Sequence, residues 1–221
     1  MTASIRCVLF DLDGTLIDSA PDLAGAANAM RVARDLAELP YERLRPMVGS
    51  GARGMVGAAF GVAPGQQGFE ALRDEFLQRY EDGLLLRTAV FAEMVAVLQA
   101  LERAALPWGI VTNKHARFAE PVVRGLGLHE RAAALICGDT TAHAKPHPEP
   151  LLEAARRAGV APQECVYVGD DLRDVQAGRA AGMATLAAAW GYLGEGEPVH
   201  EWGADAVIEN PLVLLKWLGM P

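Results

Sequence analysis

The sequence predicts an α/β protein in which a doubly wound parallel sheet carries an inserted α-helical cap domain. An apolar run at 5–10 indicates a buried strand, and it stops at two carboxylates, Asp11 and Asp13. From residue 91 onward, helical and strand patterns alternate, which is typical of a parallel sheet. The helical segment between them is far too long for an ordinary crossover. We therefore expect a core domain of residues 1–15 and 88–221 and a cap domain of residues 16–87.

Four helices are expected in the cap domain, because apolar residues recur there at helical spacing. The pattern is clearest in the last of them, where Phe69, Phe76 and Tyr80 share one face. Glycine-rich stretches at 49–51 and 61–68 separate the helices. The expected helices cover 21–36, 41–45, 52–60 and 69–80.

The core domain is expected to alternate strands with helices after the cap. Apolar runs of strand length lie between segments with helical periodicity. The expected strands cover 108–112, 133–137, 165–169, 183–188 and 206–208. The expected helices cover 92–104, 115–126, 148–158 and 172–181.

Composition narrows the classes of protein that this chain can belong to. Its 20 Lys and Arg against 28 Asp and Glu give a net charge of −8, which disfavours a nucleic-acid surface or an anionic membrane. No run approaches the roughly 20 apolar residues that span a bilayer. The N-terminus shows no secretory signal pattern, and Cys7, Cys137 and Cys165 are odd in number without metal-type spacing. We expect a cytoplasmic protein.

Polar side chains follow the expected strands where each one ends. Asp11 and Asp13 follow the first strand, Thr112 and Asn113 end the second, and Asp170 follows a later one. Ligands of open parallel sheets bind just beyond the carboxyl ends of the strands. Carboxylates two residues apart on an extended segment point the same way and can address one hard cation. The plain alternative for Asp11 to Gly14 is a strand end followed by an Asp-Gly turn.

These residue types suit a Mg²⁺ ion and a phosphate group. Asp11 is the candidate nucleophile, because a carboxylate that attacks phosphorus splits the transfer into two easier steps. Asp13 is the candidate acid and base for the leaving oxygen and for water. Lys145, which taken alone would be an ordinary loop lysine, offsets the crowded negative charge. Thr112 and Asn113 offer donors to the phosphate.

In these residues the chain resembles the haloacid dehalogenase-like phosphatase superfamily, in particular its members with a helical cap. The resemblance rests on the segment Asp11 to Thr15, on Thr112, on Lys145 before a proline, and on Gly169-Asp170 with Asp174. It implies a Rossmann-like core and a Mg²⁺ ion held by Asp11, the carbonyl of Asp13 and Asp170, with Asp174 supporting them. Asp171 stands where the family often has Ser.

Within the superfamily the chain resembles the phosphoglycolate phosphatase group. Segments 51–56, 69–80, 108–121 and 202–205 look similar to N-acetylmuramic acid 6-phosphate phosphatases. Both substrates carry a carboxylate, so a cation is expected in the cap. Arg53 is the candidate, because a guanidinium pairs bidentately with a carboxylate, and Arg43 and Arg45 are the alternatives.

The glycine pattern G-x-G-x-x-G at 49–54 is weak as a nucleotide signature, because it follows a helix and not a strand. A cap hinge or a helix start is the expected role.

The leading functional hypothesis is a Mg²⁺-dependent phosphatase that acts on a small phosphorylated metabolite. We expect such an enzyme to bind neither nucleic acid nor membrane. Its oligomeric state would be monomer or homodimer. A sugar phosphomutase would use the same residues but return the phosphoryl group to the substrate. From another class, a phospho-receiver module or a non-catalytic phosphate-binding protein places similar residues at strand ends, but receiver modules lack a helical insert after the first strand.

Overall fold

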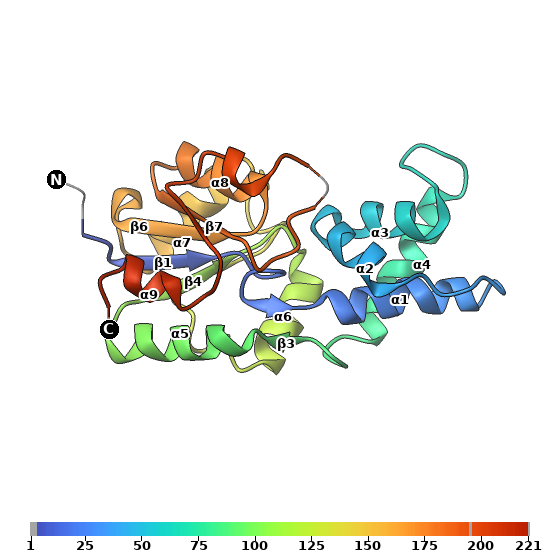
Figure 1. The fold of residues 1–221 in the computed structure, drawn as a ribbon, viewed down its shortest axis with the longest axis horizontal. Helices are drawn as coiled ribbons and strands as arrows, with labels where there is room; N and C mark the ends of the chain where they lie inside the picture. Colours follow the sequence, from blue (N-terminus) through green and yellow to red (C-terminus); the bar gives the residue numbers. More distant parts are fainter. Residues whose placement is uncertain (1–3, 195, 221) are drawn as a thin grey trace.

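The core of the molecule is a six-stranded parallel sheet (Figure 1). The computed structural model describes residues 4–194 and 196–220. In spatial order the strands are β5 (Leu135–Ile136), β4 (Trp108–Val111), β1 (Cys7–Phe10), β6 (Cys165–Gly169), β7 (Ala184–Ala188) and β8 (Ala206–Ile208). Each neighbouring pair runs parallel, so the predicted doubly wound α/β fold is confirmed.

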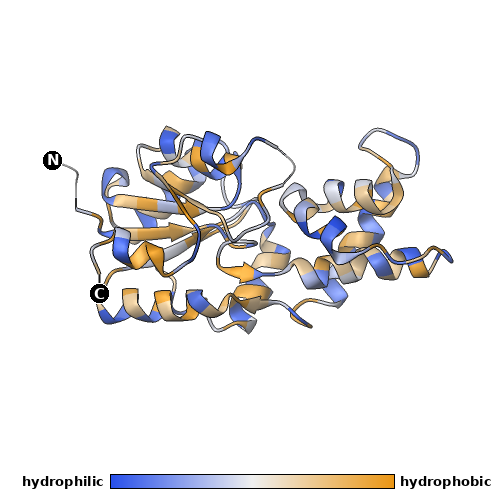
Figure 2. Cartoon of the chain, viewed as in Figure 1, coloured by the Kyte–Doolittle hydropathy of each residue, from blue (hydrophilic) through white to orange (hydrophobic). Residues whose placement is uncertain are grey.

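Helices cover both faces of this sheet. On one face lie α5 (Ala92–Arg103), α6 (Ala116–Gly125) and α9 (Val213–Trp217), and on the other lie α7 (Glu149–Ala158) and α8 (Leu172–Ala180). Successive residues of a strand point to opposite faces, so Val8 and Phe10 pack with the first group, and Cys7 and Leu9 with the second. The strands of the sheet are accordingly mostly apolar (Figure 2).

The remaining helices form a separate body beside the sheet (Figure 1). They are α1 (Ala20–Val32), α2 (Tyr41–Leu44), the 3₁₀ helix η1 (Arg45–Ser50), α3 (Gly51–Phe60) and α4 (Phe69–Asp82). Met30, Met55 and Phe76 belong to a hydrophobic cluster that is distinct from those of the sheet. A two-stranded antiparallel ribbon, β2 (Ile17–Asp18) with β3 (Ala89–Val90), joins the two bodies. We propose that the helical body, residues 16–87, is the cap domain.

The structure departs from the sequence expectation in several places. The strand expected at 133–137 is reduced to the two residues of β5. The first cap helix ends at Val32 and not at residue 36, because Asp35 takes a left-handed backbone with φ 54°, and no Gly or Pro announces this turn in the sequence. The ribbon of β2 and β3 was not expected, since two-residue strands carry no detectable alternation. The short α9 was also missed. Short 3₁₀ turns lie at Pro162–Glu164 and Val199–Glu201.

The cysteines contribute to the interior of the sheet domain. Cys7, Cys137 and Cys165 are buried with free thiols. Across residues 4–194 and 196–220, no helix combines the length and the apolar character that a membrane crossing requires.

Candidate active site

Three carboxylates meet at the carboxyl ends of β1 and β6. Asp11 follows β1, Asp170 follows β6, and Asp174 lies in the first turn of α8. The two strands are neighbours, and the amide of Asp11 donates a hydrogen bond of 2.9 Å to the carbonyl of Val168. One carboxylate oxygen from each of the three aspartates lies within 4.8 Å of the others. Strand pairing therefore builds this cluster from residues that lie far apart in the sequence.

A buried lysine holds two members of this cluster. The ammonium of Lys145 lies 2.8 Å from Oδ1 of Asp11 and 2.7 Å from Oδ1 of Asp174. It also donates to the hydroxyl of Tyr167 at 2.7 Å and to the carbonyl of Val111 at 3.0 Å. Burial alone would lower the pKa of Lys145, but the two carboxylates raise it above its usual range, so the ammonium stays charged.

One lysine does not balance three aspartates. Burial, together with the neighbouring Asp174, raises the pKa of Asp11 to about 7 although Lys145 opposes the shift. Burial and the charges of Asp11 and Asp174 also raise the pKa of Asp170. A hard divalent cation would relieve this repulsion, and carboxylate oxygens are the ligands that Mg²⁺ prefers. The donor set therefore fits the expected magnesium ion.

Asp170 is fixed in place from three sides. The hydroxyl of Thr15 donates to its Oδ1 and the amide of Tyr192 to its Oδ2, each at 2.8 Å. Gly14, with φ 88°, lies so close that a Cβ atom there would overlap the Asp170 carboxylate. Gly14 thus serves both the left-handed turn and the close approach of the two segments.

Asp13 lies outside the three-carboxylate cluster and faces the pocket. Its Oδ1 accepts hydrogen bonds from the ammonium of Lys114 at 2.8 Å and from the hydroxyl of Ser19. Burial would lower the pKa of Lys114, but the charge of Asp13 raises it above its usual range. These two contacts fix the position of the Asp13 side chain at the edge of the pocket.

Thr112 and Asn113 follow β4 and border the same pocket. The hydroxyl of Thr112 accepts from the amide of Lys114 at 3.1 Å. The side-chain amide of Asn113 makes two hydrogen bonds with the main chain of Lys145, at 2.9 and 3.0 Å. Asn113 therefore positions the loop that carries Lys145.

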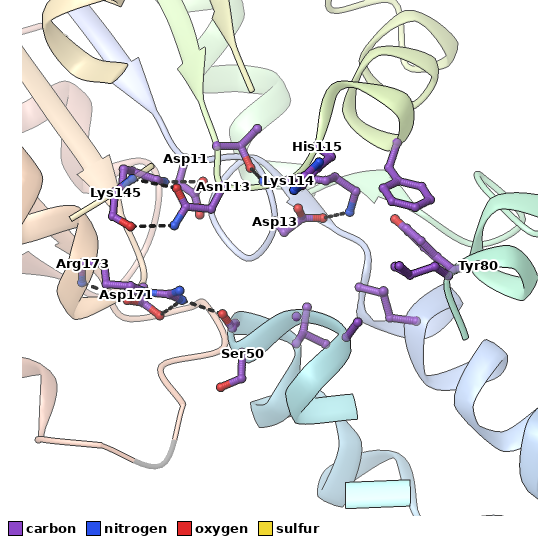
Figure 3. Close-up of a pocket in the computed structure, with 18 of the residues that line it drawn as sticks. Asp11, Asp13, Ser50, Tyr80, Asn113, Lys114, His115, Lys145, Asp171 and Arg173 are labelled. Atoms are coloured by element: carbon purple, nitrogen blue, oxygen red, sulfur yellow. Dashed lines mark hydrogen bonds and ion pairs between the residues drawn. The ribbon is translucent and has the colours of Figure 1, made fainter. Parts of the chain in front are cut away.

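The pocket itself has a volume of about 640 Å³ and lies between the sheet and the helical cap. Figure 3 shows Asp11 and Lys145 on one side, Tyr80 on the other, and Asp13 with Lys114 between them. Every predicted catalytic or metal-binding residue lines this pocket; they are Asp11, Asp13, Thr112, Lys145, Asp170 and Asp174. The predicted substrate residue Asn113 also lines it.

Arg53 does not join these residues. It lies on an exposed part of α3 and is not among the side chains that line the pocket. Its neighbours Gly51 and Ala52, at the start of α3, do line it. The glycine segment at 49–54 thus spans the end of the 3₁₀ helix η1 and the start of α3 beside the pocket, and it does not follow a strand.

Arg173 links the end of the 3₁₀ helix η1 in the cap to the core. Its guanidinium pairs with Asp171 at 2.7 Å and also donates to the carbonyl of Gly49. Asp171 in turn caps α8, because it accepts from the amide of Arg173 while Asp174 accepts from the amide of Asp171. This capping box sets the direction of the helix that carries Asp174.

Arg45 makes a second contact between cap and core. Its guanidinium donates to the carbonyls of Trp190 and Gly191, at 3.0 and 2.9 Å, and lies 5.0 Å from the centre of the Tyr192 ring. We expect Arg45→Met to lower the free energy of unfolding by about 1–3 kcal/mol in urea denaturation, because two charge-assisted hydrogen bonds are lost. Arg43→Met, which changes an exposed side chain two residues away, is the matched control. Equal stability of the two variants would contradict the expectation.

Comparison with known proteins identifies the family. The family model of haloacid dehalogenase-like hydrolases matches residues 5–182. The chain belongs to this family. It is 45% identical over 212 residues to an N-acetylmuramic acid 6-phosphate phosphatase of Pseudomonas putida, covering 96% of this chain and 95% of the relative. It is 50% identical over 207 residues to a phosphoglycolate phosphatase of Xanthomonas campestris, covering 93% of each.

The fold of this haloacid dehalogenase-like hydrolase agrees with solved structures. The crystal structure of a predicted phosphoglycolate phosphatase from Haemophilus somnus matches with a TM-score of 0.84 at 24% identity, over 98% of this chain and 99% of that one. The family and fold expected from the sequence are thereby confirmed.

Lys114 and Tyr80 are among the pocket residues of this hydrolase to which sequence reasoning assigned no role. Lys114 follows Thr112 and Asn113 at a strand end, which was a usable signal, but nothing in the sequence pairs it with Asp13. Tyr80 carried only the signal of a core position on α4, and the structure places it both in the core and on the pocket wall.

Proposed function

We propose that this hydrolase removes the phosphoryl group from a small carboxylated phosphomonoester through an aspartyl-phosphate on Asp11. The relatives that match over nearly the whole chain are phosphatases by name, for N-acetylmuramic acid 6-phosphate and for phosphoglycolate, so phosphoric monoester hydrolysis is the reaction class. The observation that carries the proposal is the Asp11 carboxylate held at 2.8 Å by the buried Lys145, on the floor of a pocket that a phosphate can enter.

The first half of the reaction transfers phosphorus to the enzyme. Lys145 holds Oδ1 of Asp11, and Oδ2 carries no hydrogen bond within residues 4–194 and 196–220, so we assign the attack on phosphorus to Oδ2. The new oxygen–phosphorus bond forms as the ester bond breaks, and Asp13 gives a proton to the leaving oxygen. Lys145 keeps the attacking carboxylate oriented and limits its repulsion from the anionic phosphate.

The second half returns the enzyme to its starting state. Asp13 takes a proton from water, the water oxygen attacks the phosphorus, and the bond to Asp11 breaks to release inorganic phosphate. Thr112 is placed to donate to the phosphoryl oxygens. Asp13 thus acts first as an acid and then as a base, and its pairing with Lys114 fixes its position in both steps.

Asp11, Asp170 and the main-chain carbonyl of Asp13 would hold the magnesium ion, with Asp174 supporting them. A bound Mg²⁺ supplies charge stabilisation for the phosphoryl oxygens as the bond to phosphorus changes. Arg53 has no part in the proposal, since its exposed position lies outside the pocket.

Phosphate release with two substrates and a chelator tests the proposal. We expect metal-dependent release of inorganic phosphate from N-acetylmuramate 6-phosphate or from 2-phosphoglycolate, a fall of at least about 100-fold in EDTA, and recovery with Mg²⁺. The measurement is kcat/KM by phosphate detection, with the organic product identified by mass spectrometry. An isomerised sugar phosphate without free phosphate would indicate a phosphomutase, and substrate binding without turnover would indicate a binding protein.

A further inference from the structure

The hydroxyl of Tyr80 is buried and, among the residues that the structure describes, has no hydrogen-bond partner. Within residues 4–194 and 196–220 it is the single buried side-chain nitrogen or oxygen in this condition. Only 2% of Tyr80 is exposed, and the residue lines the pocket opposite Asp11 (Figure 3). A buried polar group without a partner costs about 1–3 kcal/mol, so such a group calls for an explanation.

The ring of Tyr80 is held firmly, so the position of its hydroxyl is set before any ligand arrives. The ammonium of Lys114 lies 4.7 Å from the ring centre, and the ring of Phe118 packs at 5.7 Å. Tyr80 belongs to α4 of the cap, whereas Lys114 and Phe118 follow β4 of the core. Burial raises the pKa of Tyr80 above its usual value although the nearby ammonium of Lys114 opposes the shift, so the hydroxyl keeps its proton.

The wall around Tyr80 is apolar. Leu23, Val48, Phe76, Leu77 and Phe118 line the pocket together with it. The pocket volume of about 640 Å³ falls in the range of roughly 300–1,000 Å³ that encloses drug-sized ligands. This space can hold a sugar-sized organic group beside the phosphate.

The charges nearby indicate which acceptor the hydroxyl would meet. The ammonium of Lys114 is already paired with Asp13, at 2.8 Å. Arg73 and Arg117 also line the pocket, and both are paired with carboxylates of α4. A substrate carboxylate at this point would lie beside Asp13 and compete for the same cation. An uncharged acceptor, such as an amide carbonyl, meets no such repulsion. 2-Phosphoglycolate has only its carboxylate beyond the ester and offers no uncharged acceptor.

We propose that Tyr80 is a specificity-determining residue whose hydroxyl donates a hydrogen bond to an uncharged acceptor on the leaving-group side of a sugar-sized, amide-bearing phosphomonoester. The inference rests on the proposed function, and it narrows the substrate class from carboxylated phosphomonoesters in general to acylated sugar phosphates. In this arrangement the phosphoryl group lies at Asp11 and Lys145, and the organic part extends along the apolar wall to Tyr80.

Tyr80→Phe tests the proposal, because it removes the hydroxyl and keeps the ring. We expect the ratio of kcat/KM for N-acetylmuramate 6-phosphate to that for 2-phosphoglycolate to fall about tenfold, at the upper end of what one uncharged hydrogen bond contributes. N-Acetylglucosamine 6-phosphate keeps the amide but lacks the lactyl carboxylate. The ratio of its kcat/KM to that of 2-phosphoglycolate should also fall about tenfold in Tyr80→Phe. Tyr41→Phe, in the cap but outside the pocket lining, is the matched control and should leave both ratios unchanged.

Stability separates a binding role from a structural one. Because the hydroxyl has no partner in the free protein, the Tm of Tyr80→Phe should equal or exceed that of the wild type. The proposal would be overturned if both kcat/KM ratios were unchanged in Tyr80→Phe. A loss of kcat/KM confined to the substrate with the lactyl carboxylate would overturn it too, because that result would identify a charged acceptor. A lowered Tm with all substrates slowed equally would indicate a structural role and would also overturn it.

A binding measurement keeps this test independent of turnover. In the Asp11→Asn background, calorimetric Kd for N-acetylmuramate 6-phosphate should rise about tenfold when Tyr80→Phe is added. If the wild type releases no phosphate from any substrate, the proposed function fails, while this Kd comparison still decides the role of Tyr80. If the wild type releases phosphate but Asp11→Asn has the same Kd with and without Tyr80→Phe, only the inference about Tyr80 fails.

Discussion

Asp11→Asn is expected to reduce phosphate release by at least about 10⁴-fold. The amide keeps the size and shape of the side chain but is a far weaker nucleophile toward phosphorus, so no aspartyl-phosphate forms. The measurement is kcat/KM with Mg²⁺ present, combined with trapping of labelled phosphoprotein from a ³²P-labelled substrate in the wild type and the variant. The label should appear only in the wild type and should be released by hydroxylamine, as acyl phosphates are.

Two controls accompany this substitution. Asp35→Asn makes the same chemical change at an exposed position with φ 54°, which Asn tolerates, and should leave the rate unchanged. Asp11→Asn also removes one negative charge from a crowded cluster, so its Tm in EDTA should not fall below that of the wild type. A variant that turns over at the wild-type rate would remove Asp11 from the chemistry and with it the proposed mechanism.

Lys145→Met is expected to have the largest effect on stability. The ammonium is buried between Asp11 and Asp174, with only 3% of the side chain exposed, and its loss leaves the carboxylates without their cation. Removing one partner of a buried ion pair costs about 3–5 kcal/mol, so the free energy of unfolding in EDTA should fall by about that amount. Turnover should fall as well, because the Asp11 carboxylate loses the group that orients it.

The sequence offers a matched control for this lysine. The chain contains three lysines, and Lys216, exposed on α9, is the one outside the site. Lys216→Met should leave both denaturant midpoint and turnover unchanged. Added Mg²⁺ should restore part of the stability of Lys145→Met, because a cation at the three carboxylates offsets the same repulsion. Equal stability of Lys145→Met and Lys216→Met in EDTA would show that the carboxylates do not need this ammonium.

Local patterns were sufficient for most elements of the core. The strands at β1, β4 and β6 are short apolar runs followed by polar residues, and in a parallel sheet such residues meet at one edge. Asp11, Thr112 and Asp170 could therefore be grouped before their distances were known. The ribbon of β2 and β3 could not be predicted, since its pairing joins segments that are two residues long and far apart in the chain.

The cap illustrates what local patterns leave open. Arg53 and Tyr80 both lie on helices with clear apolar periodicity, and the sequence favoured the charged residue as the substrate contact. The structure exposes Arg53 and buries Tyr80 against Lys114, because the way a helix packs on its neighbours decides which of its faces borders a pocket. That packing depends on contacts from distant segments, such as Phe118 of the core.

The sequence by itself determined the order of the main strands and helices, the inserted helical segment and the residue types at the strand ends, because alternation and spacing are local properties of the chain. The tertiary structure decided that Lys145 lies between Asp11 and Asp174, that Lys114 pairs with Asp13, and that the hydroxyl of Tyr80 is buried beside the pocket with no hydrogen-bond partner among the described residues. The two ion-pair contacts join segments that only packing brings together, and packing also decides where the Tyr80 hydroxyl lies. No periodicity along the chain encodes either.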